Sequence, residues 1–353
     1  MTITGKEAGL HRTSTSFTSP RPLAGVDAPM SRLLRPEPLH DVRAQPIDQS
    51  TPIREVHRLL SQGRPVLISD RYETGLRLME ALDPNLTNGV LVGVKQHRIQ
   101  LRDAPANGFL TDLYEEGSFA LPFRAAVELN EAWRWFHKGV HFPVLGHRLH
   151  PFYGTYAPIR MTHLELFGTW LSQYEGPRDV ATDVGTGCGI LSFQLIRAGF
   201  KQVRATDRNP NAIESVKREL ARRSPPPPIT PLVGDLLAEP SEPMDVIVFN
   251  PPWTQGSPRS LLDGAMVFEP DLFPRFFAQA HEHIAAHGRV VIVFSTLIRL
   301  VQPDVPHPIE QELERGRFQL VQRLQRKAPP GKNPDGSRRR TKEKLEVWEL
   351  RRS

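Results

Sequence analysis

The chain has 353 residues, of which 39% are hydrophobic and 24% charged, so it is long enough for two modest domains or one large domain with extensions. Its single cysteine excludes an internal disulfide and favours a reducing, cytoplasmic location. No apolar run approaches the length needed to cross a bilayer, so we expect no membrane partner.

The net charge of +6 is concentrated in one segment of the sequence. Between residues 323 and 344 there are nine Lys or Arg and two Asp or Glu, a local balance of +7, so the rest of the chain carries about −1. A basic segment of this kind is either a binding site for a polyanion such as RNA or a solvated loop without a partner.

The N-terminal third predicts a leader followed by a small domain. Residues 1–51 are rich in Ser, Thr, Pro and Arg and contain no hydrophobic signal core, which predicts a disordered leader. Residues 52–148 predict a small α/β domain. Its apolar spacing indicates helices at 53–60, 76–82 and 121–135 and strands at 65–69 and 90–94.

Residues 149–353 predict a larger domain in which strands and helices alternate. Apolar runs indicate strands at 180–183, 203–207, 230–233, 246–249 and 290–295, with helices at 190–198, 210–223 and 272–286. Residues 318–324 and 345–350 form a final strand pair without a helix between them. This order predicts an α/β fold with a mostly parallel sheet covered by helices on both faces.

A glycine-rich turn follows the first strand of this domain. The sequence Asp183-Val184-Gly185-Thr186-Gly187-Cys188-Gly189 stands where a buried strand passes into a helix. Glycines let the backbone approach a ligand closely, and the helix N-terminus offers unpaired N–H groups. The spacing G-x-G-x-G differs from the G-x-G-x-x-G of nicotinamide-binding proteins and suits a cofactor without a pyrophosphate. A purely structural tight turn is the alternative.

Two further carboxylates end the next strands. Asp207 stands about twenty residues after the glycines, where a carboxylate can accept both ribose hydroxyls of a nucleoside cofactor. Such an Asp is often only a helix cap, a role that Asn209 can fill instead. Asp235 follows the third strand, where it can meet an adenine amino group. The three positions in register favour a cofactor site.

The fourth strand ends in Asn250-Pro251-Pro252-Trp253, which we interpret as the catalytic segment. A planar amide or aromatic amine is a poor nucleophile because its lone pair is delocalised. The side-chain oxygen of Asn250 and the carbonyl of Pro251 can each accept one N–H of such a nitrogen. Pro251 and Pro252 rigidify the loop, and Trp253 offers a face for stacking. The alternative is a Pro-rich turn beside a core Trp.

Together these motifs resemble class I S-adenosylmethionine-dependent methyltransferases, in particular the small-domain group with an Asn-Pro-Pro-aromatic motif. That group includes release-factor glutamine methyltransferases and methyltransferases of rRNA base amines, which more often have Tyr or Phe where this chain has Trp253. The resemblance implies a Rossmann-like seven-stranded sheet, places the cofactor against Gly185, Gly187, Asp207 and Asp235, and implies that Asn250 and Pro251 hold the target nitrogen.

The resemblance extends upstream of the glycine turn. Residues 150–160 look like the segment that covers the cofactor in bacterial relatives, and 63–82 look like part of their N-terminal domain. Tyr153 and Tyr156 either shape this cover or are ordinary interface aromatics. The candidate cofactor-binding residues are then Tyr156, Arg160, Asp183, Gly185, Thr186, Gly187, Gly189, Asp207, Asn209, Asp235 and Asn250.

Other chemistry-bearing residues are set aside. Cys188 stands inside the glycine turn, where a small residue is needed, and no Cys accompanies Pro251 and Pro252, which disfavours thiolate chemistry. The 13 His residues form no convincing metal-ligand set, so we expect no metal site.

In the fold that the resemblance implies, the sixth strand runs parallel to the first five, so its C-terminal end lies at the ligand edge. If 318–324 is that strand, the basic loop 325–344 borders the acceptor site. Arg338, Arg339 and Arg340 are then placed to attract phosphates.

We therefore expect an N-methyltransferase that uses S-adenosyl-L-methionine and acts on a planar amino or amide nitrogen. A nucleobase amine in RNA comes first, because the basic loop should border the pocket. A protein glutamine side chain and a small molecule of a biosynthetic pathway are the alternatives. From other classes, a nicotinamide-dependent oxidoreductase is opposed by the glycine spacing, and a non-catalytic cofactor-binding module is opposed by Asn250–Trp253.

Overall fold

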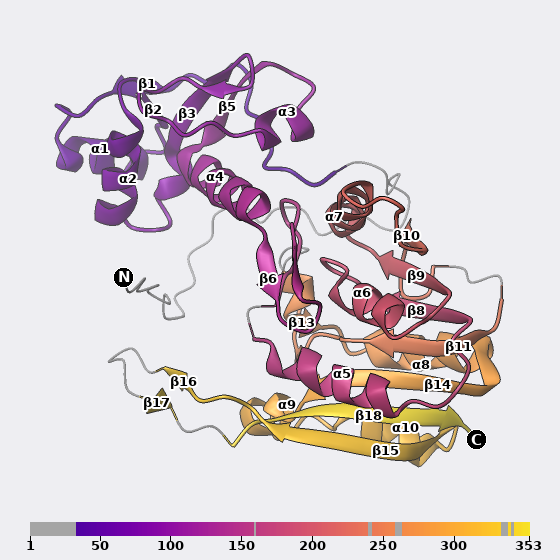
Figure 1. The fold of residues 1–353 in the computed structure, drawn as a ribbon. Helices are drawn as coiled ribbons and strands as arrows, with labels where there is room; N and C mark the ends of the chain where they lie inside the picture. Colours follow the sequence, from indigo (N-terminus) through magenta and orange to yellow (C-terminus); the bar gives the residue numbers. More distant parts are fainter. Residues whose placement is uncertain (1–32, 159, 239–241, 258–262, 333–337, 340–341) are drawn as a thin grey trace.

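The computed structural model describes residues 33–158, 160–238, 242–257, 263–332, 338–339 and 342–353. They build two principal sheets, a five-stranded one near the N-terminus and a seven-stranded one in the C-terminal part, which lie in separate parts of the molecule (Figure 1). Within these ranges, no helix is long and apolar enough to span a bilayer.

The N-terminal sheet has the order β1-β2-β3-β4, and β5 also pairs with β3. The first three strands run parallel, whereas β4 and β5 run antiparallel to β3. Its strands are β1 (Gln45–Ile47), β2 (Val66–Ile68), β3 (Val90–Lys95), β4 (Arg98–Ile99) and β5 (Ser118–Pro122). Its helices are α1 (Ile53–Ser61), α2 (Tyr72–Ala81), η1 (Thr87–Gly89), α3 (Phe109–Leu113) and α4 (Phe123–Lys138).

The expected leader differs from the structure in residues 33–51. The amide and carbonyl of Leu39 both bond Ala120 of β5, and β1 pairs with β2. These backbone bonds explain the order, because an added strand satisfies its polar groups through its neighbour whatever its composition. Residues 1–32 lie outside the described part of the chain.

A connecting segment holds the two parts together. After the hairpin of β6 (Val140–Phe142) and β7 (His147–Leu149), residues 150–156 run along α7 (Pro210–Ala221). The buried amide of Asn211 on α7 bonds the backbone of Leu34 through both its side-chain atoms and also donates to the carbonyl of Tyr153, at 2.7–2.9 Å. The N-terminal part is therefore fixed to a helix of the larger sheet.

The C-terminal sheet has the order β10-β9-β8-β11-β14-β18-β15. Only β18 runs antiparallel to its neighbours, so β15 points in the same direction as the first five strands, as predicted. The strands are β8 (Val180–Val184), β9 (Gln202–Asp207), β10 (Ile229–Val233), β11 (Met244–Phe249), β14 (Ile284–Ser295), β15 (Phe318–Lys327) and β18 (Lys344–Arg352). The expected Rossmann-like sheet is confirmed.

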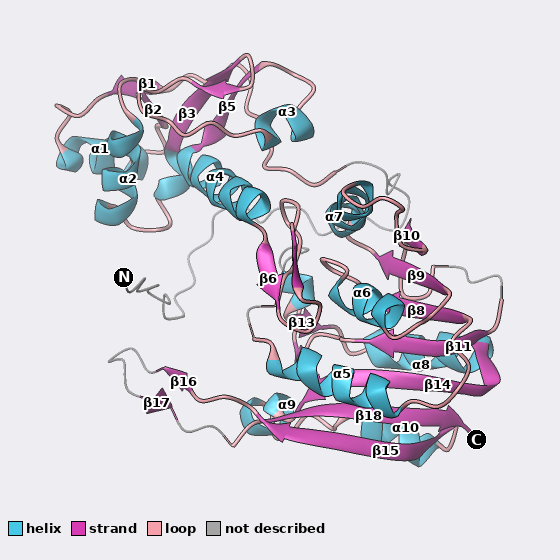
Figure 2. Cartoon of the chain, viewed as in Figure 1, coloured by secondary structure: helices cyan, strands magenta, loops and turns pink. Residues whose placement is uncertain are grey.

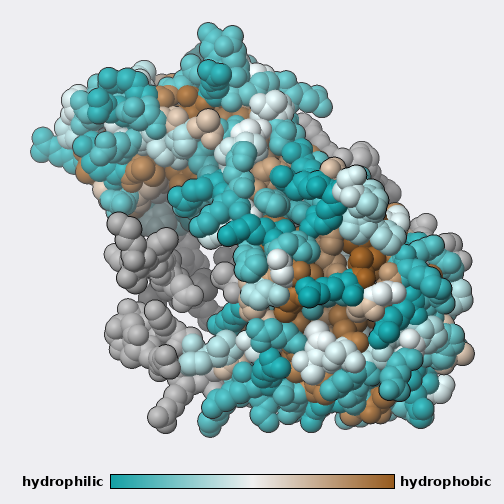
Figure 3. Space-filling model, viewed as in Figure 1, coloured by the Kyte–Doolittle hydropathy of each residue, from teal (hydrophilic) through white to brown (hydrophobic). Residues whose placement is uncertain are grey.

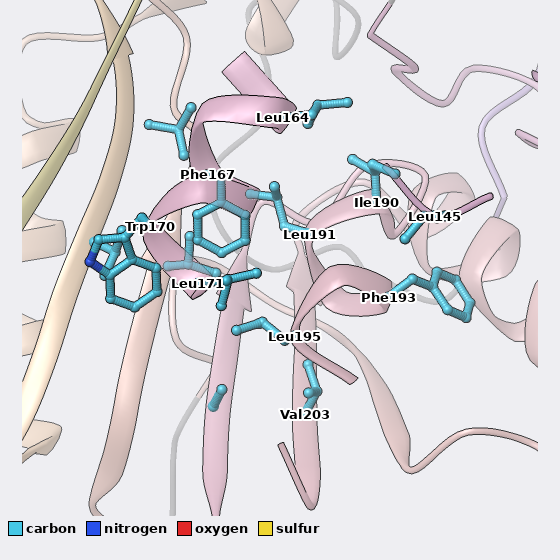
Figure 4. Close-up of a cluster of buried hydrophobic side chains, with 14 of the residues drawn as sticks. Leu145, Leu164, Phe167, Trp170, Leu171, Ile190, Leu191, Phe193, Leu195 and Val203 are labelled. Carbon is cyan, nitrogen blue, oxygen red and sulfur yellow. The ribbon is translucent and has the colours of Figure 1, made fainter. Parts of the chain in front are cut away.

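Helices cover both faces because the strands alternate buried side chains between two cores. On β11, Val246 and Val248 face α5 (Thr162–Gln173), α6 (Ile190–Arg197) and α7. Ile247 and Phe249 face α8 (Leu272–His283), α9 (Leu297–Val301) and α10 (Pro308–Arg315). Figure 4 shows the first of these cores, in which side chains of α5 and α6 meet above the strands. Burial on both faces fixes the register of the sheet.

Several elements differ from the sequence prediction (Figure 2). The expected helix 272–286 ends at His283, because Ile284 already begins β14 through its pairing with Met244 of β11. The helix α5 and the helix α10 were not predicted. Small strand pairs also occur between the main elements: β12 (Thr254–Gln255) with β13 (Val267–Phe268), near η2 (Asp263–Ala265), and β16 (Gly331–Lys332) with β17 (Arg338–Arg339).

Candidate active site

The predicted site residues converge on one edge of the large sheet. In β8 and β11, Val184 pairs with Phe249, so the glycine turn and Asn250 leave neighbouring strands at the same level. In β8 and β9, Val184 pairs with Thr206, which brings Asp207 beside the same turn. Carboxyl ends of parallel strands meet at one edge, which is where ligands bind in open α/β sheets. On the face shown in Figure 3 the surface is mostly hydrophilic, with scattered hydrophobic patches.

The glycine turn adopts a conformation that requires glycine. The φ angles of Gly185, Gly187 and Gly189 are 64°, 53° and 86°, all in the left-handed region. A Cβ atom on Gly187 would lie 3.0 Å from the carbonyl oxygen of Tyr156, so the connecting segment approaches the turn closely. The structure therefore brings Tyr156 to the turn, as expected for a residue that covers a ligand there.

Asp183 anchors the start of α6 and keeps one oxygen free. Its Oδ2 accepts hydrogen bonds from Thr186 Oγ1 at 2.7 Å, from the Ser192 amide at 2.9 Å and from Ser192 Oγ at 2.7 Å. Its Oδ1 is buried and has no hydrogen-bond partner in the structure. Burial raises the pKa of Asp183 to about 6, against the hydrogen bonds that lower it. An unpaired buried carboxylate oxygen is costly and suits a ligand that carries N–H groups.

Asp207 closes the other side of the turn. Its Oδ2 accepts from the Gly187 amide at 2.9 Å and its Oδ1 from the Asn209 amide at 2.8 Å. Burial raises the pKa of this carboxyl, and the two backbone amides oppose the rise. Each oxygen can accept a further bond, so the two ribose hydroxyls of a nucleoside remain compatible with the observed contacts.

Asn209 serves as the cap of α7. Its side-chain oxygen accepts from the Asn211 amide at 3.0 Å, and its side-chain nitrogen donates to the carbonyl of Gly154 at 2.8 Å. This is the structural role that the sequence left open for this position. The side chain links the connecting segment to α7, so any contact with a cofactor stays a prediction.

Asp235 lies beyond β10, and its carboxylate forms an ion pair with an arginine. Its carboxylate pairs with Arg275 of α8, which also bonds Asp271 at 2.7 Å. The side chain of Asp235 is exposed, and sequence reasoning did not find its partner Arg275, which follows 40 residues later. Contact with an adenine amino group requires that Arg275 give up this pairing or share it.

The Asn-Pro-Pro-Trp segment leaves β11 with two side-chain polar atoms unpaired. Asn250 Oδ1 is buried without a hydrogen-bond partner in the structure, and so is Trp253 Nε1. Pro251 is buried, and Pro252 and Trp253 are half-buried. The indole packs against the cores on both faces of the sheet. An acceptor oxygen and a donor nitrogen are thus held at the strand end without internal bonds.

His163 is a residue that sequence reasoning missed. It stands in the first turn of α5, and its ring lies 5.5 Å from the ring of Trp253 at an interplanar angle of 88°. Only 2% of the residue is exposed, and neither ring nitrogen has a hydrogen-bond partner in the structure. Burial, reinforced by the charge of Arg160, lowers the pKa of His163 to about 4, so the ring is neutral at pH 7.

Arg160 is directed to a different partner from the one expected. Its Nη1 lies 3.4 Å from Glu343 Oε2, and Glu343 Oε1 accepts from Ser295 Oγ at 2.7 Å. Glu343 directly precedes β18, and Ser295 ends β14. Arg160 therefore ties the segment before α5 to the C-terminal strands, and its contact with a cofactor stays a prediction.

The thiol of Cys188 is not suited to nucleophilic chemistry. The side chain is 2% exposed, and burial raises its pKa to about 12, which keeps the thiol protonated at neutral pH. The residue fills space behind the turn.

Comparison with known proteins identifies this region. Residues 169–317 match the family described as methyltransferase small domain. This part of the chain is a class I, S-adenosylmethionine-dependent methyltransferase domain. The resemblance expected from the sequence is confirmed.

The methyltransferase domain also matches curated relatives over short stretches. It is 39% identical over 80 residues to the ribosomal protein L11 methyltransferase of Geobacillus kaustophilus. This alignment covers 23% of this chain and 26% of the relative. It is 39% identical over 104 residues to the release factor glutamine methyltransferase of Deinococcus radiodurans, which covers 29% of this chain and 36% of the relative. These alignments span about a quarter and a third of the relatives' own lengths.

A solved structure is similar at a low level. The ribosomal protein L11 methylase from Lactobacillus delbrueckii subsp. bulgaricus is 20% identical and aligns with 56% of this chain and 82% of its own, with a TM-score of 0.38.

The methyltransferase domain offers groups that fit S-adenosylmethionine. Asp183 Oδ1 has no internal partner and can accept from an ammonium group, and Asp207 can accept from ribose hydroxyls. The bound cofactor would supply a methyl group on a cationic sulfur.

Proposed function

We propose that this protein transfers a methyl group from S-adenosylmethionine to a planar amino or amide nitrogen of a macromolecule. The observation that most directly supports this proposal is the unpaired Oδ1 of Asn250, which is buried at the end of β11 beside the glycine turn. A buried acceptor without a donor costs about 1–3 kcal/mol of folding free energy. That cost is offset when an N–H group of the acceptor molecule occupies the position.

The chain's own residues act mainly by positioning. Asn250 Oδ1 and the Pro251 carbonyl accept the two N–H groups of the nitrogen, which directs its lone pair out of the plane towards the methyl group. The two prolines limit the freedom of this loop. Trp253 provides the aromatic face against which a flat acceptor stacks. Holding the reactants in line supplies much of the rate where the methyl donor is already electrophilic.

RNA is the acceptor that we place first. The strand β15 points towards the ligand edge, and its end carries Arg326 and Lys327, next to the partner Lys344 on β18. The basic segment 325–344 continues from that end, and its residues 333–337, Arg340 and Thr341 lie outside the described part of the chain. A positive segment beside the acceptor site favours a polyanion. The glutamine side chain of a protein comes second, because one curated relative is a release factor glutamine methyltransferase.

Transfer of tritiated methyl groups tests this proposal. The full chain is incubated with labelled S-adenosylmethionine and a cell extract, which is then separated into RNA, protein and small molecules. We expect label in RNA that is sensitive to ribonuclease. Label in protein alone would contradict RNA and favour a glutamine side chain as the acceptor. Label in metabolites alone would favour a small molecule of a biosynthetic pathway. Calorimetry with S-adenosylmethionine and NADH separates the methyltransferase from an oxidoreductase, because only the first should bind.

A further inference from the structure

Two residues of the Asn-Pro-Pro-Trp segment, and a histidine in contact with one of them, have buried polar atoms without partners. Trp253 Nε1, Asn250 Oδ1 and both ring nitrogens of His163 are all shielded from solvent and unbonded in the structure. His163 and Trp253 are in contact across 5.5 Å, although they come from α5 and from the loop after β11. Native proteins satisfy most buried polar groups, so a cluster of unpaired ones needs an explanation.

His163 is the least easily explained member of this cluster. A buried neutral imidazole has one donor and one acceptor nitrogen, and leaving both unpaired costs more than placing a Phe ring there. The aromatic contact with Trp253 accounts for a ring at this position but not for its nitrogens. The connecting segment and α5 offer no hydrogen-bond partner to the ring among the described residues.

We propose that His163 is a further residue of the acceptor site and that a ring nitrogen of its imidazole hydrogen-bonds the acceptor molecule. This inference rests on the proposed N-methyltransferase function. Asn250 and Pro251 accept both N–H groups of the target nitrogen, which leaves the neighbouring carbonyl oxygen or ring nitrogen of the acceptor to be bonded by the N–H of a neutral imidazole. The indole of Trp253 is half-buried and contacts the imidazole edge to face, so an acceptor that stacks on this indole comes close to His163.

A second buried histidine provides a matched control. His307, at the start of α10, is 6% exposed, and neither of its ring nitrogens has a hydrogen-bond partner in the structure. It contacts Phe294 and Trp348 on the face of the sheet opposite α5. His307 therefore shares the chemistry and burial of His163 but not its place beside Trp253.

The experiment compares His163→Phe, His163→Gln and His307→Phe with the full wild-type chain. The readouts are tritiated methyl transfer into the fraction that the wild type labels, S-adenosylhomocysteine binding by calorimetry, and thermal unfolding. We expect His163→Phe to lower kcat/KM at least tenfold, to bind the cofactor product within twofold of wild type, and to keep or raise Tm by about 2 °C. His163→Gln should recover part of the activity, and His307→Phe should retain transfer within twofold.

Distinct results would overturn the two proposals. An active wild type with an equally active His163→Phe variant would remove His163 from the acceptor site and leave the methyltransferase proposal standing. A His163→Phe variant whose Tm falls well below that of His307→Phe would assign the imidazole to packing instead. A wild type that labels no fraction would contradict the proposed function itself.

Discussion

At the scale of single residues, the proposed acceptor chemistry depends on side chains at the end of β11. Asn250 is the residue for which the sequence motif and the structure agree most directly, since its unpaired Oδ1 sits beside the glycine turn. Its role predicts a separation of two effects. Removing the oxygen should affect binding of the target nitrogen and not binding of the cofactor, for which other residues are proposed.

Asn250→Ala should abolish methyl transfer and leave cofactor binding nearly unchanged. The reason is that the substitution removes the acceptor for an N–H group while Asp183, Asp207 and the glycine turn stay in place. Transfer is measured with labelled S-adenosylmethionine, and binding is measured by calorimetry with S-adenosylhomocysteine. Loss of both activities together would mean that Asn250 supports the cofactor site and not the acceptor site.

Gly187→Ala should weaken cofactor binding by tenfold or more. A methyl group there would lie 3.0 Å from the Tyr156 carbonyl oxygen and would also strain a φ of 53°. The control is Gly199→Ala, which has a φ of 92° but meets only Arg178 Cδ at 4.0 Å. Calorimetry at equal folded fraction checks the pair. Equal losses in the two variants would assign the effect to backbone strain alone.

At the scale of elements, the strand pair β15–β18 decides where the basic segment leaves the sheet. The ladder runs from Phe318 opposite Arg352 to Lys327 opposite Lys344, so the segment between the strands leaves the sheet at the ligand edge. The same geometry links Glu343, just before β18, to Arg160 before α5. A charge change in the segment is therefore expected to act near the acceptor site.

Reversing the charge of Arg338 and Arg339 to Glu should weaken methyl transfer to RNA and make the remaining transfer less sensitive to salt. Each lost phosphate contact reduces the slope of log affinity against log salt by about 0.7 to 0.9, because fewer counterions are released on binding. The control reverses Arg351 and Arg352, which are exposed at the opposite end of β18. Initial rates measured from about 50 to about 200 mM salt check the prediction. Equal effects of the two reversals would argue for net charge and against a local contact.

At the scale of the whole molecule, two buried imidazoles couple stability to pH. Burial lowers the pKa of His163 and of His307 to about 4, from about 6.5 in an unfolded chain. Between these values the unfolded chain binds protons that the folded chain does not. The free energy of unfolding therefore falls as pH drops below about 6.5, and above that pH these groups have no effect. Arg160 faces the first ring, and Glu310, Arg299 and Arg323 act on the second.

The raised pKa of Asp183 has the opposite effect, since it increases the free energy of unfolding as the pH falls. The contribution of a single histidine is therefore measured by comparing a variant that lacks it with the wild type at each pH. His307→Phe should gain roughly 2 kcal/mol of stability relative to wild type when the pH is lowered from about 7 to about 5, since about 1.5 pKa units of titration are removed. Urea unfolding at both pH values measures this gain. A difference between variant and wild type that stays constant with pH would contradict the lowered pKa of His307.

Local sequence signals were sufficient where residues act through backbone geometry or strand order. The alternation of strands and helices predicted the parallel sheet, because buried strands and amphipathic helices have recognisable periods. The glycine turn and Asn250–Trp253 were placed correctly, since parallel strands bring their carboxyl ends to one edge whatever the details of packing. The helix α5 was missed because Met161 provides no side-chain cap at its start. The strands β6 and β7 were missed because each has three residues that include a His or Arg, so neither forms an apolar run.

The sequence by itself therefore determined the sheet, its ligand edge and the positions of Asp183, Asp207 and Asn250. Only the tertiary structure decided the pairing of Asp235 with Arg275, the pairing of Arg160 with Glu343, and the contact of His163 with Trp253. The physical reason is that these contacts join residues 40 to 183 positions apart. Periodicity and motif spacing report on neighbours along the chain, whereas such pairs arise only when helices pack on the sheet.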